Sequence, residues 1–362
     1  MIEALRRRVD AFFGRGAAAV TVPSMDGALR PNSLLDAARV VASAARPDNL
    51  TLAGDEIVFS SEGAVVALDA RSGEVRERLR LPATVASLAW SNGVLAVGLP
   101  GEIRLVGGAF DGRAFDRLGD FAPLCPTALA FESPGALIVA LGSQLNPPEE
   151  WKRDLLQRNA SGAVCRVDLA TGATEVLATG LSYPYGLAVR GGEIWVSESW
   201  RHRIVALRPA APARPILEHL PAYPARLAPS SDGGVWLSMF APRRQMIEFV
   251  LREPGYRERM MAEVDEAYWM APALATGRSF LEPIHGGQVK HLGIVKPWGP
   301  TRSYGLVVRL GDAGIPTASL HSRADGKRHG VTSALETDAG LLIASKGGDV
   351  VLEADLANLD RE

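Results

Sequence analysis

Residues 185–198 read YGLAVRGGEIWVSE: a short apolar strand, a Gly-Gly turn and a second apolar strand. Five other segments repeat this order of strand, turn and a run of apolar residues, and they begin at Asp48, Ala86, Thr127, Ala225 and Thr332. Most of these starts are about 40 residues apart, which is the length of one four-stranded propeller blade. The repeat therefore predicts an all-β protein, a six-bladed β-propeller, with seven blades as the alternative.

A ring explains why such a unit is repeated. A single blade cannot bury both faces of its sheet, whereas neighbouring blades around a ring cover one another. We assign the propeller to residues 47–356 and a tail to residues 357–362. Residues 1–46 are expected to supply a strand that closes the ring and a helix over residues 34–45, with Asn32 or Ser33 as its N-cap.

Two longer intervals between repeats indicate insertions. The third repeat contains residues 143–161, with a short helical stretch over Lys152–Gln157. The fifth contains a helical insertion at about residues 243–275, and Gly305–Leu310 either completes this repeat or opens the sixth. Apolar residues of the second insertion recur at helical spacing, which predicts an amphipathic helix pair lying on the propeller. The alternative is a lid over the channel mouth, or a contact for a protein or membrane partner through residues 246–269.

The composition excludes several classes of protein. Of the 362 residues, 47% are hydrophobic and 22% charged, and the net charge is −2. This balance excludes a protein that binds nucleic acid through bulk electrostatics. There is no run of about 18 apolar residues, so we expect no transmembrane segment. Cys125 and Cys165 do not make a disulfide framework, and we expect a cytoplasmic protein.

The N-terminal residues 1–16 contain three consecutive arginines, Arg6–Arg8, followed by Phe12 and Phe13. Their apolar residues fall at helical spacing. Such a helix is expected to pack on its own domain; the alternative is that it rests on an anionic membrane surface.

Residues at the start of the inner strands are expected to point toward the axis of a propeller. The candidate binding residues on the floor and rim of a central pocket are Asp48, Thr127, Tyr183, Tyr185, Arg226, His329 and Thr332. These groups suit a polar organic molecule that presents a carboxylate or phosphate to Arg226. The alternative is that Asp48 and Arg226 form a buried pair that only fills the channel. No catalytic residue is identified.

Several motifs along the chain point to a known family. They are WKRDLL (151–156), GAVCRVDLATG (162–172), LSYPYGL (181–187), WVSESWRHRI (195–204), LPAYP (220–224) and SSDGGVW (230–236). Taken in order, they resemble the strictosidine-synthase-like six-bladed propellers, which are relatives of the gluconolactonases and paraoxonases. The resemblance covers roughly residues 46–356. It implies the fold more strongly than an activity, because these relatives include both hydrolases and a condensing synthase.

The hydrolytic relatives hold a calcium ion in the channel with a Glu and several Asn or Asp residues. The resemblance matches those ligand positions to Asp48, Thr127, Tyr185 and Ala225–Arg226. One carboxylate, a hydroxyl, a phenol and a guanidinium do not make the oxygen cage that calcium requires. We therefore expect no metal and no other cofactor, and the resemblance places the cation of Arg226 where the metal charge would be, facing Asp48.

The synthase of the family implies a channel glutamate on the last blade that acts as a general base. Thr332 occupies that position here, and Glu336 falls near the turn after the strand. We therefore predict a strictosidine-synthase-like propeller that binds a small polar organic molecule in its central pocket, with metal-independent hydrolase or lyase activity left open. The alternative is a non-catalytic scaffold for a protein or membrane partner. A calcium-dependent lactonase or esterase, or a Pictet–Spengler-type synthase, is less favoured.

Overall fold

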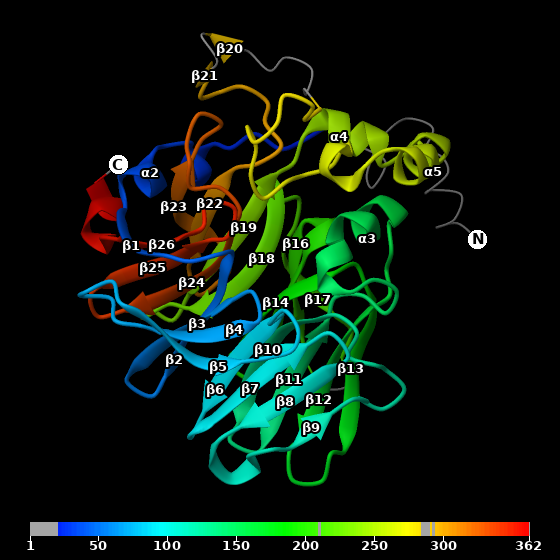
Figure 1. Cartoon of the computed structure of the whole chain (residues 1–362), viewed down its shortest axis with the longest axis vertical. Coiled ribbons are helices and arrows are strands. Elements are labelled where there is room, and N and C mark those ends of the chain that lie inside the picture. The colour runs from blue at the N-terminus through cyan, green and yellow to red at the C-terminus, as the bar shows by residue number, and fades with distance from the viewer. Residues whose placement is uncertain (1–20, 209–210, 284–289, 292–293, 362) are drawn as a thin grey trace.

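The computed structural model describes residues 21–208, 211–283, 290–291 and 294–361. These residues form six four-stranded antiparallel sheets, the blades of a propeller (Figure 1). The first blade consists of β2 (Pro47–Ala53), β3 (Glu56–Ser61), β4 (Ala64–Leu68) and β5 (Val75–Arg80). The second consists of β6 (Ser87–Ser91), β7 (Val94–Leu99), β8 (Glu102–Val106) and β9 (Ala114–Phe115). The third consists of β10 (Pro126–Ser133), β11 (Ala136–Leu141), β12 (Gly162–Asp168) and β13 (Thr174–Leu181).

The last three blades include the closure of the ring. The fourth blade is β14 (Pro184–Arg190), β15 (Glu193–Glu198), β16 (Arg203–Leu207) and β17 (Arg214–Leu217). The fifth is β18 (Ala222–Pro229), β19 (Val235–Pro242), β22 (Gly305–Leu310) and β23 (Pro316–Ser322), so residues 305–310 complete the fifth repeat. The sixth is β24 (Val331–Thr337), β25 (Gly340–Ser345), β26 (Val350–Ala354) and, from the other end of the chain, β1 (Arg39–Ser43).

The innermost strands contact one another in the closed order β2, β6, β10, β14, β18, β24 and β2. This confirms the predicted all-β, six-bladed β-propeller. Aliphatic side chains fill the space between each pair of neighbouring blades, forming six clusters of buried residues. Each sheet thus covers the face of the next, as the repeat required.

The helix expected over residues 34–45 is much shorter. Helix α2 spans only Leu34–Ala37, and strand β1 follows it directly. The reason is tertiary, because Val40 pairs with Leu352 of β26 and this pairing overrides the local helical pattern. Ser33 occupies the N-cap position without a side-chain hydrogen bond, whereas Asn32 Oδ1 accepts from the N–H of Leu34 at 3.1 Å. The expected helix within residues 1–16 lies outside the described residues.

The insertions place three helices together on one side of the propeller (Figure 1). Helix α3 (Trp151–Gln157) belongs to the third blade, and α4 (Gln245–Val250) and α5 (Pro254–Glu263) to the fifth. They are followed by a 3₁₀ turn over Glu266–Tyr268 and by two short antiparallel strands of two residues each, β20 (Lys290–His291) and β21 (Ile294–Val295). Ile247, Val250, Met260 and Trp269 are buried, as expected of an amphipathic insertion, whereas Phe249 is 54% exposed.

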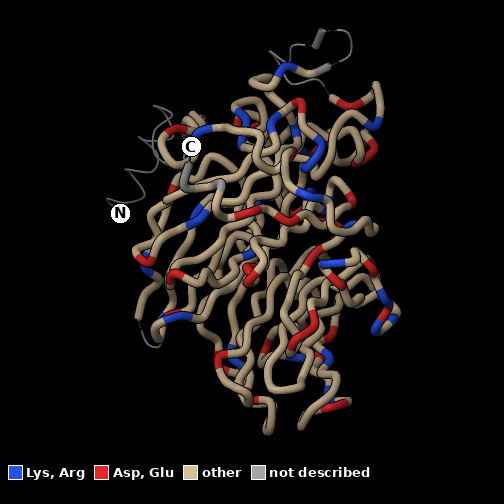
Figure 2. The backbone as a smooth tube through the Cα atoms, turned by 90° about the vertical axis from the view of Figure 1, so that its left-hand side faces the viewer, with Lys and Arg blue, Asp and Glu red and all other residues tan. Residues whose placement is uncertain are grey.

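Acidic and basic residues are interspersed along the chain (Figure 2), in agreement with its near-neutral charge. Both cysteines are buried and unpaired. Within the described ranges, every helix is too short or too polar to cross a membrane.

Candidate functional site

The candidate site lies where the inner strands begin. In five of the six inner strands, the pairing with the second strand shifts register near the first residues. Such bulges redirect side chains, and here they fall within residues 48–51, 126–128, 184–186, 224–227 and 331–333. β6 pairs regularly instead. The sequence repeats therefore mark the positions at which the chain bends at the hub.

Small hydroxyl groups join the blades around this hub. The Ser87 hydroxyl donates to the carbonyl of Pro126 at 2.6 Å. The Thr127 hydroxyl donates to the carbonyl of Pro184, and the Leu50 N–H donates to Ser333 Oγ at 2.9 Å. The hydroxyl of Thr127 is thus used by the fold, because it connects the third blade to the fourth.

The centre of the hub is a cluster of three charged side chains, Asp48, Arg226 and Lys346. Arg226 Nε donates to Asp48 Oδ1 at 3.0 Å and Nη2 donates to Asp48 Oδ2 at 3.3 Å. Lys346 Nζ donates to the same Oδ2 at 2.9 Å. The remaining contacts of the guanidinium are the carbonyls of Thr127 and Ala86, the latter at 2.8 Å. Arg226 thereby links the fifth blade to the first three.

This cluster has a net positive charge. Burial by itself would raise the pKa of Asp48, but the charges of Arg226 and Lys346 outweigh burial and hold this pKa well below its usual range. Burial acts against the charge on Arg226, and Asp48 reverses that effect, so the pKa of Arg226 is raised. The cluster thus has two formal positive charges, on Arg226 and Lys346, against one negative charge on Asp48.

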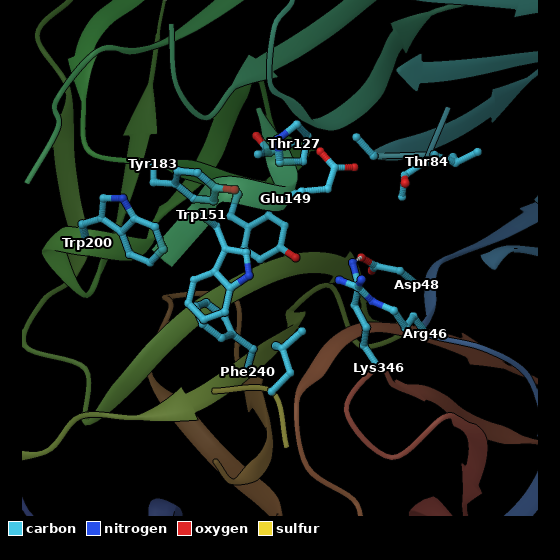
Figure 3. Close-up of a pocket in the computed structure, with 15 residues that line it drawn as sticks. Arg46, Asp48, Thr84, Thr127, Glu149, Trp151, Tyr183, Trp200, Phe240 and Lys346 are labelled. Carbon is cyan, nitrogen blue, oxygen red and sulfur yellow. Dashed lines mark hydrogen bonds and ion pairs between the residues drawn. The ribbon is translucent and has the colours of Figure 1, made fainter. Parts of the chain in front are cut away.

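Aromatic side chains form the opposite wall. Tyr183 and Trp200 stack with their ring centroids 4.4 Å apart, and Trp151 meets Phe240 edge to face at 5.4 Å. Tyr185 lies between wall and cluster: its ring centroid is 5.9 Å from that of Phe240 and 5.1 Å from Arg226 Cζ. Figure 3 shows Trp151, Tyr183, Trp200 and Phe240 on one side of the pocket, with Arg46, Asp48 and Lys346 on the other.

The space between the two walls is a cavity of about 50 Å³. A buried water needs roughly 10–15 Å³ of such volume, so the cavity holds only a few waters. Arg46 and Glu149 also line it, and both are exposed. A ligand that enters must therefore be small, or must place only its polar end inside.

The structure brings together five of the seven candidate residues. Asp48, Thr127, Tyr183 and Tyr185 line the cavity, and Arg226 lies behind Asp48. The contact between Asp48 and Arg226 is the buried pair of the alternative interpretation, yet a pocket remains beside it. Tyr183 has a φ of 59°, a left-handed conformation that is strained for a residue with a side chain.

His329 and Thr332 do not line this cavity. His329 is only 5% exposed; its Nδ1 is 2.7 Å from Ser303 Oγ and its Nε2 is 2.7 Å from the Arg323 carbonyl. The ring therefore does not stand at the rim as expected, because these two hydrogen bonds hold it in the interior. Thr332 is completely buried.

Four residues that line the cavity are not among the predicted ones: Trp151, Trp200, Phe240 and Lys346. Antiparallel pairing offers a signal for three of them, because it sets the end of each second strand beside the start of the first. Trp200 follows β15, Phe240 lies near the end of β19 and Lys346 follows β25. Trp151 comes from the insertion of the third blade, and its position depends on how that insertion folds back.

Two carboxylates near the hub motifs have structural roles. Glu198 is completely buried, accepts from Arg203 Nε at 2.6 Å and accepts from the N–H of Ser182 at 2.7 Å. Glu336 accepts hydrogen bonds from the Ser231 hydroxyl and from the indole N–H of Trp236. It is the penultimate residue of β24, next to the turn, as expected.

The residues at the hub do not fit a calcium ion. Calcium requires six to eight oxygen ligands. Here both oxygens of Asp48 already accept hydrogen bonds from cations, and the guanidinium of Arg226 occupies the space that those oxygens face. Among the described residues, no group of three or more His, Cys, Asp and Glu side chains is arranged to hold a metal ion.

Comparisons with known proteins show the fold and no more. No protein-family model matches the chain, and no curated protein matches it either. Among solved structures, a gluconolactonase from Xanthomonas campestris is similar, with 15% identity over 92% of this chain and 97% of that chain and a TM-score of 0.55. The calcium-binding protein regucalcin from Agrobacterium tumefaciens has 12% identity over 88% and 92%, with a TM-score of 0.53.

A putative gluconolactonase is also similar, with 11% identity over 88% of this chain and 92% of that chain and a TM-score of 0.51. The chain therefore shares the propeller fold of the gluconolactonase- and regucalcin-like structures. At such identities the likeness does not transfer their chemistry. The narrower resemblance to strictosidine-synthase-like proteins stays a prediction.

Proposed function

We propose that the protein is a metal-independent propeller that binds a small organic anion, a carboxylate with a short apolar body, in the hub cavity. The observation that supports this proposal is the arrangement of an aromatic wall opposite a cluster with one surplus positive charge. Lys346 has three N–H donors, and Asp48 uses one of them. The remaining donors can bind a carboxylate, while Trp151 and Tyr185 contact its apolar part.

The same contacts favour binding over hydrolysis. Asp48 is a poor general base, because two cations hold its pKa well below the usual range. Burial raises the pKa of Tyr183 and Tyr185, so neither phenol is ionised at neutral pH. Burial likewise raises the pKa of the Cys125 thiol, to about 12, so it is not a nucleophilic thiolate. A proton-transfer role would fall to the exposed Glu149.

Calorimetry with propionate and its neutral analogue propionamide tests the proposal. Propionate is expected to bind at least about ten times more tightly than propionamide. Lys346→Gln should weaken propionate about 10- to 100-fold, because a hydrogen bond to a charged group contributes about 1.5–3 kcal/mol. Lys327→Gln makes the same change at an exposed lysine outside the cavity and should have no effect. Equal binding of the two compounds, or full affinity in Lys346→Gln, would contradict the proposal.

Titration with calcium tests the metal-independent part. The wild-type protein is expected to show neither heat of binding nor a rise in Tm with calcium, since Arg226 occupies the hub. Micromolar calcium binding would show that the oxygen ligands rearrange around a metal. It would overturn the fit argument without affecting the propionate result.

A further inference from the structure

A second and larger cavity lies outside the hub, at the edge of the fifth blade. Its volume is about 730 Å³, within the range of about 300–1,000 Å³ that is typical of small-molecule sites. We call it the arginine groove. Its apolar lining includes Val22, Met25, Met246 and Trp298, and its charged lining is Arg243, Arg244 and Arg323. It shares no lining residue with the hub cavity.

The three arginines of the groove differ in their partners. Arg243 Nε donates to Glu248 at 3.1 Å, so its charge is compensated. Arg244 Nε donates only to the carbonyl of Thr301, at 3.1 Å. Arg323 has a buried Nε without a hydrogen-bond partner. In the part of the chain that the structure describes, no carboxylate forms an ion pair with Arg244 or Arg323.

Uncompensated cations in such a position are costly. Burial lowers the pKa of Arg244, which expresses the free energy lost when its charge leaves water. Arg244 and Arg323 both lie close enough to Tyr304, which lines the groove, to act on its hydroxyl; Asp36 and Asp325 act on it with the opposite sign, but neither forms an ion pair with the two arginines. An anion between them would recover that cost, since guanidinium groups bind carboxylate and phosphate through paired hydrogen bonds.

We propose that the arginine groove is a second ligand site, which binds an amphiphilic organic anion. A carboxylate or phosphate group is held by Arg244 and Arg323, and the apolar body contacts Trp298 and Met246. These two residues are 69% and 41% exposed, respectively, so each offers apolar surface to a ligand. The ligand is expected to be amphiphilic because the groove has a cationic lining for an oxyanion and an apolar lining for the rest of the molecule.

The test measures the binding of hexanoate, phenyl phosphate and neutral 1-hexanol by calorimetry and by tryptophan fluorescence. To silence the hub, the full chain has the Lys346→Gln substitution in every sample. At least one of the two oxyanions is expected to bind ten-fold or more tightly than 1-hexanol; which one does so identifies the head group. Arg244→Gln and Arg323→Gln should each weaken that binding about 10- to 100-fold. Trp298→Phe should abolish the fluorescence change.

Two further variants distinguish a specific loss of binding from a loss caused by misfolding. Met246→Glu alters an exposed side chain and places a negative charge on the groove wall, so it should also weaken the anion ten-fold or more while Tm is unchanged. Arg117→Gln removes an exposed arginine outside the groove and should leave binding intact. Tighter or equal binding of 1-hexanol overturns the proposal. So does undiminished anion binding in Arg244→Gln and Met246→Glu.

Discussion

The hub and the arginine groove both contain buried or half-buried arginines, but the surroundings of these arginines are opposite. Arg226 at the hub donates to both oxygens of Asp48 and to two backbone carbonyls, and it faces the ring of Tyr185. Arg244 in the groove donates to one carbonyl, and Arg323 leaves a buried Nε unpaired. The hub provides an acidic partner for Arg226, whereas among the described residues no carboxylate forms an ion pair with Arg244 or Arg323.

This difference separates a structural charge from a binding charge. A buried ion pair with complete hydrogen bonding fixes the relative positions of the elements it joins, although it adds little net stability. A guanidinium without an acid keeps its capacity to bind an anion. In the hub cluster, Lys346 retains that capacity, and the volume of the cavity, about 50 Å³, limits the ligand to a small one. In the groove the arginines themselves provide it.

The largest expected effect follows from breaking the hub pair. Arg226→Met should lower the free energy of unfolding by about 3–5 kcal/mol, because it leaves Asp48 buried with one partner in place of two. Urea unfolding, with the slope of the transition checked for change, measures this loss. The double variant Asp48→Leu/Arg226→Met removes both charges and should recover part of it. A loss below about 1 kcal/mol would mean that water already reaches the pair.

The next effect concerns pH and lies on the groove side. The ring of buried His321 forms two hydrogen bonds, between Nδ1 and the Tyr304 hydroxyl (3.1 Å) and between Nε2 and the Ser319 hydroxyl (2.8 Å). Burial lowers the pKa of His321 from 6.5 to about 4. Above pH 6.5 both folded and unfolded states hold it neutral. Below that pH the unfolded state binds the proton first, so stability is lost until about pH 4.

The loss amounts to about 3 kcal/mol, since each pKa unit corresponds to about 1.36 kcal/mol. Over the same range Asp48 stays ionised, so the hub pair is intact. Urea unfolding at pH 7, 5.5 and 4 should show the decline, and His321→Gln should flatten it. The same slope in this variant would assign the decline to His202 or His329, whose pKa values burial also lowers.

The sequence was sufficient for the fold and for the line of residues along the axis. Strand, turn and strand recur in six segments, most of which begin about 40 residues apart, and this repeat predicted the six blades. Asp48 and Tyr185 could be placed because each lies at the start of an inner strand, and Arg226 could be placed because it is the second residue of the fifth repeat. That Arg226 would face Asp48 was expected from a cation standing in the place of a metal, and the structure shows this contact.

The rest of the site depends on tertiary packing, which no local sequence pattern predicts. Trp151 reaches the cavity only because the insertion of the third blade folds over it, tied down by the buried Asp154, which accepts from Trp200 Nε1 at 2.8 Å. His329 lies just before the sixth blade, but its ring is buried between Ser303 and the Arg323 carbonyl, which the repeat does not predict. The arginine groove joins segments from three distant parts of the chain, so composition and spacing gave no sign of it.

A smaller effect sharpens the contrast between the two arginine sites. Arg244→Met should leave the free energy of unfolding within about 1 kcal/mol of wild type, since the lost hydrogen bond to Thr301 is offset by removal of an uncompensated charge. The measurement is the same urea titration used for Arg226→Met, which serves as its matched partner. A loss comparable to that of Arg226→Met would show that Arg244 has an acidic partner. The groove would then have no uncompensated charge at Arg244 to bind an anion.

The smallest expected effect is the loss of an exposed ion pair, which is a reference for the stability changes at the hub and in the groove. Glu56 on the outer surface of the first blade pairs with Arg76 at 2.9 Å and with Arg78, and the side chains of these two arginines are 62% and 47% exposed. Water and salt screen such pairs, so Glu56→Gln should change stability by less than about 1 kcal/mol. The remaining difference should disappear in 1 M salt, where the Debye length is about 3 Å. The Arg226→Met loss should persist there, because salt screens a buried ion pair much less than an exposed one. If salt removed both, the hub pair would behave as a surface pair, and burial would no longer explain what distinguishes Arg226 from the other arginines.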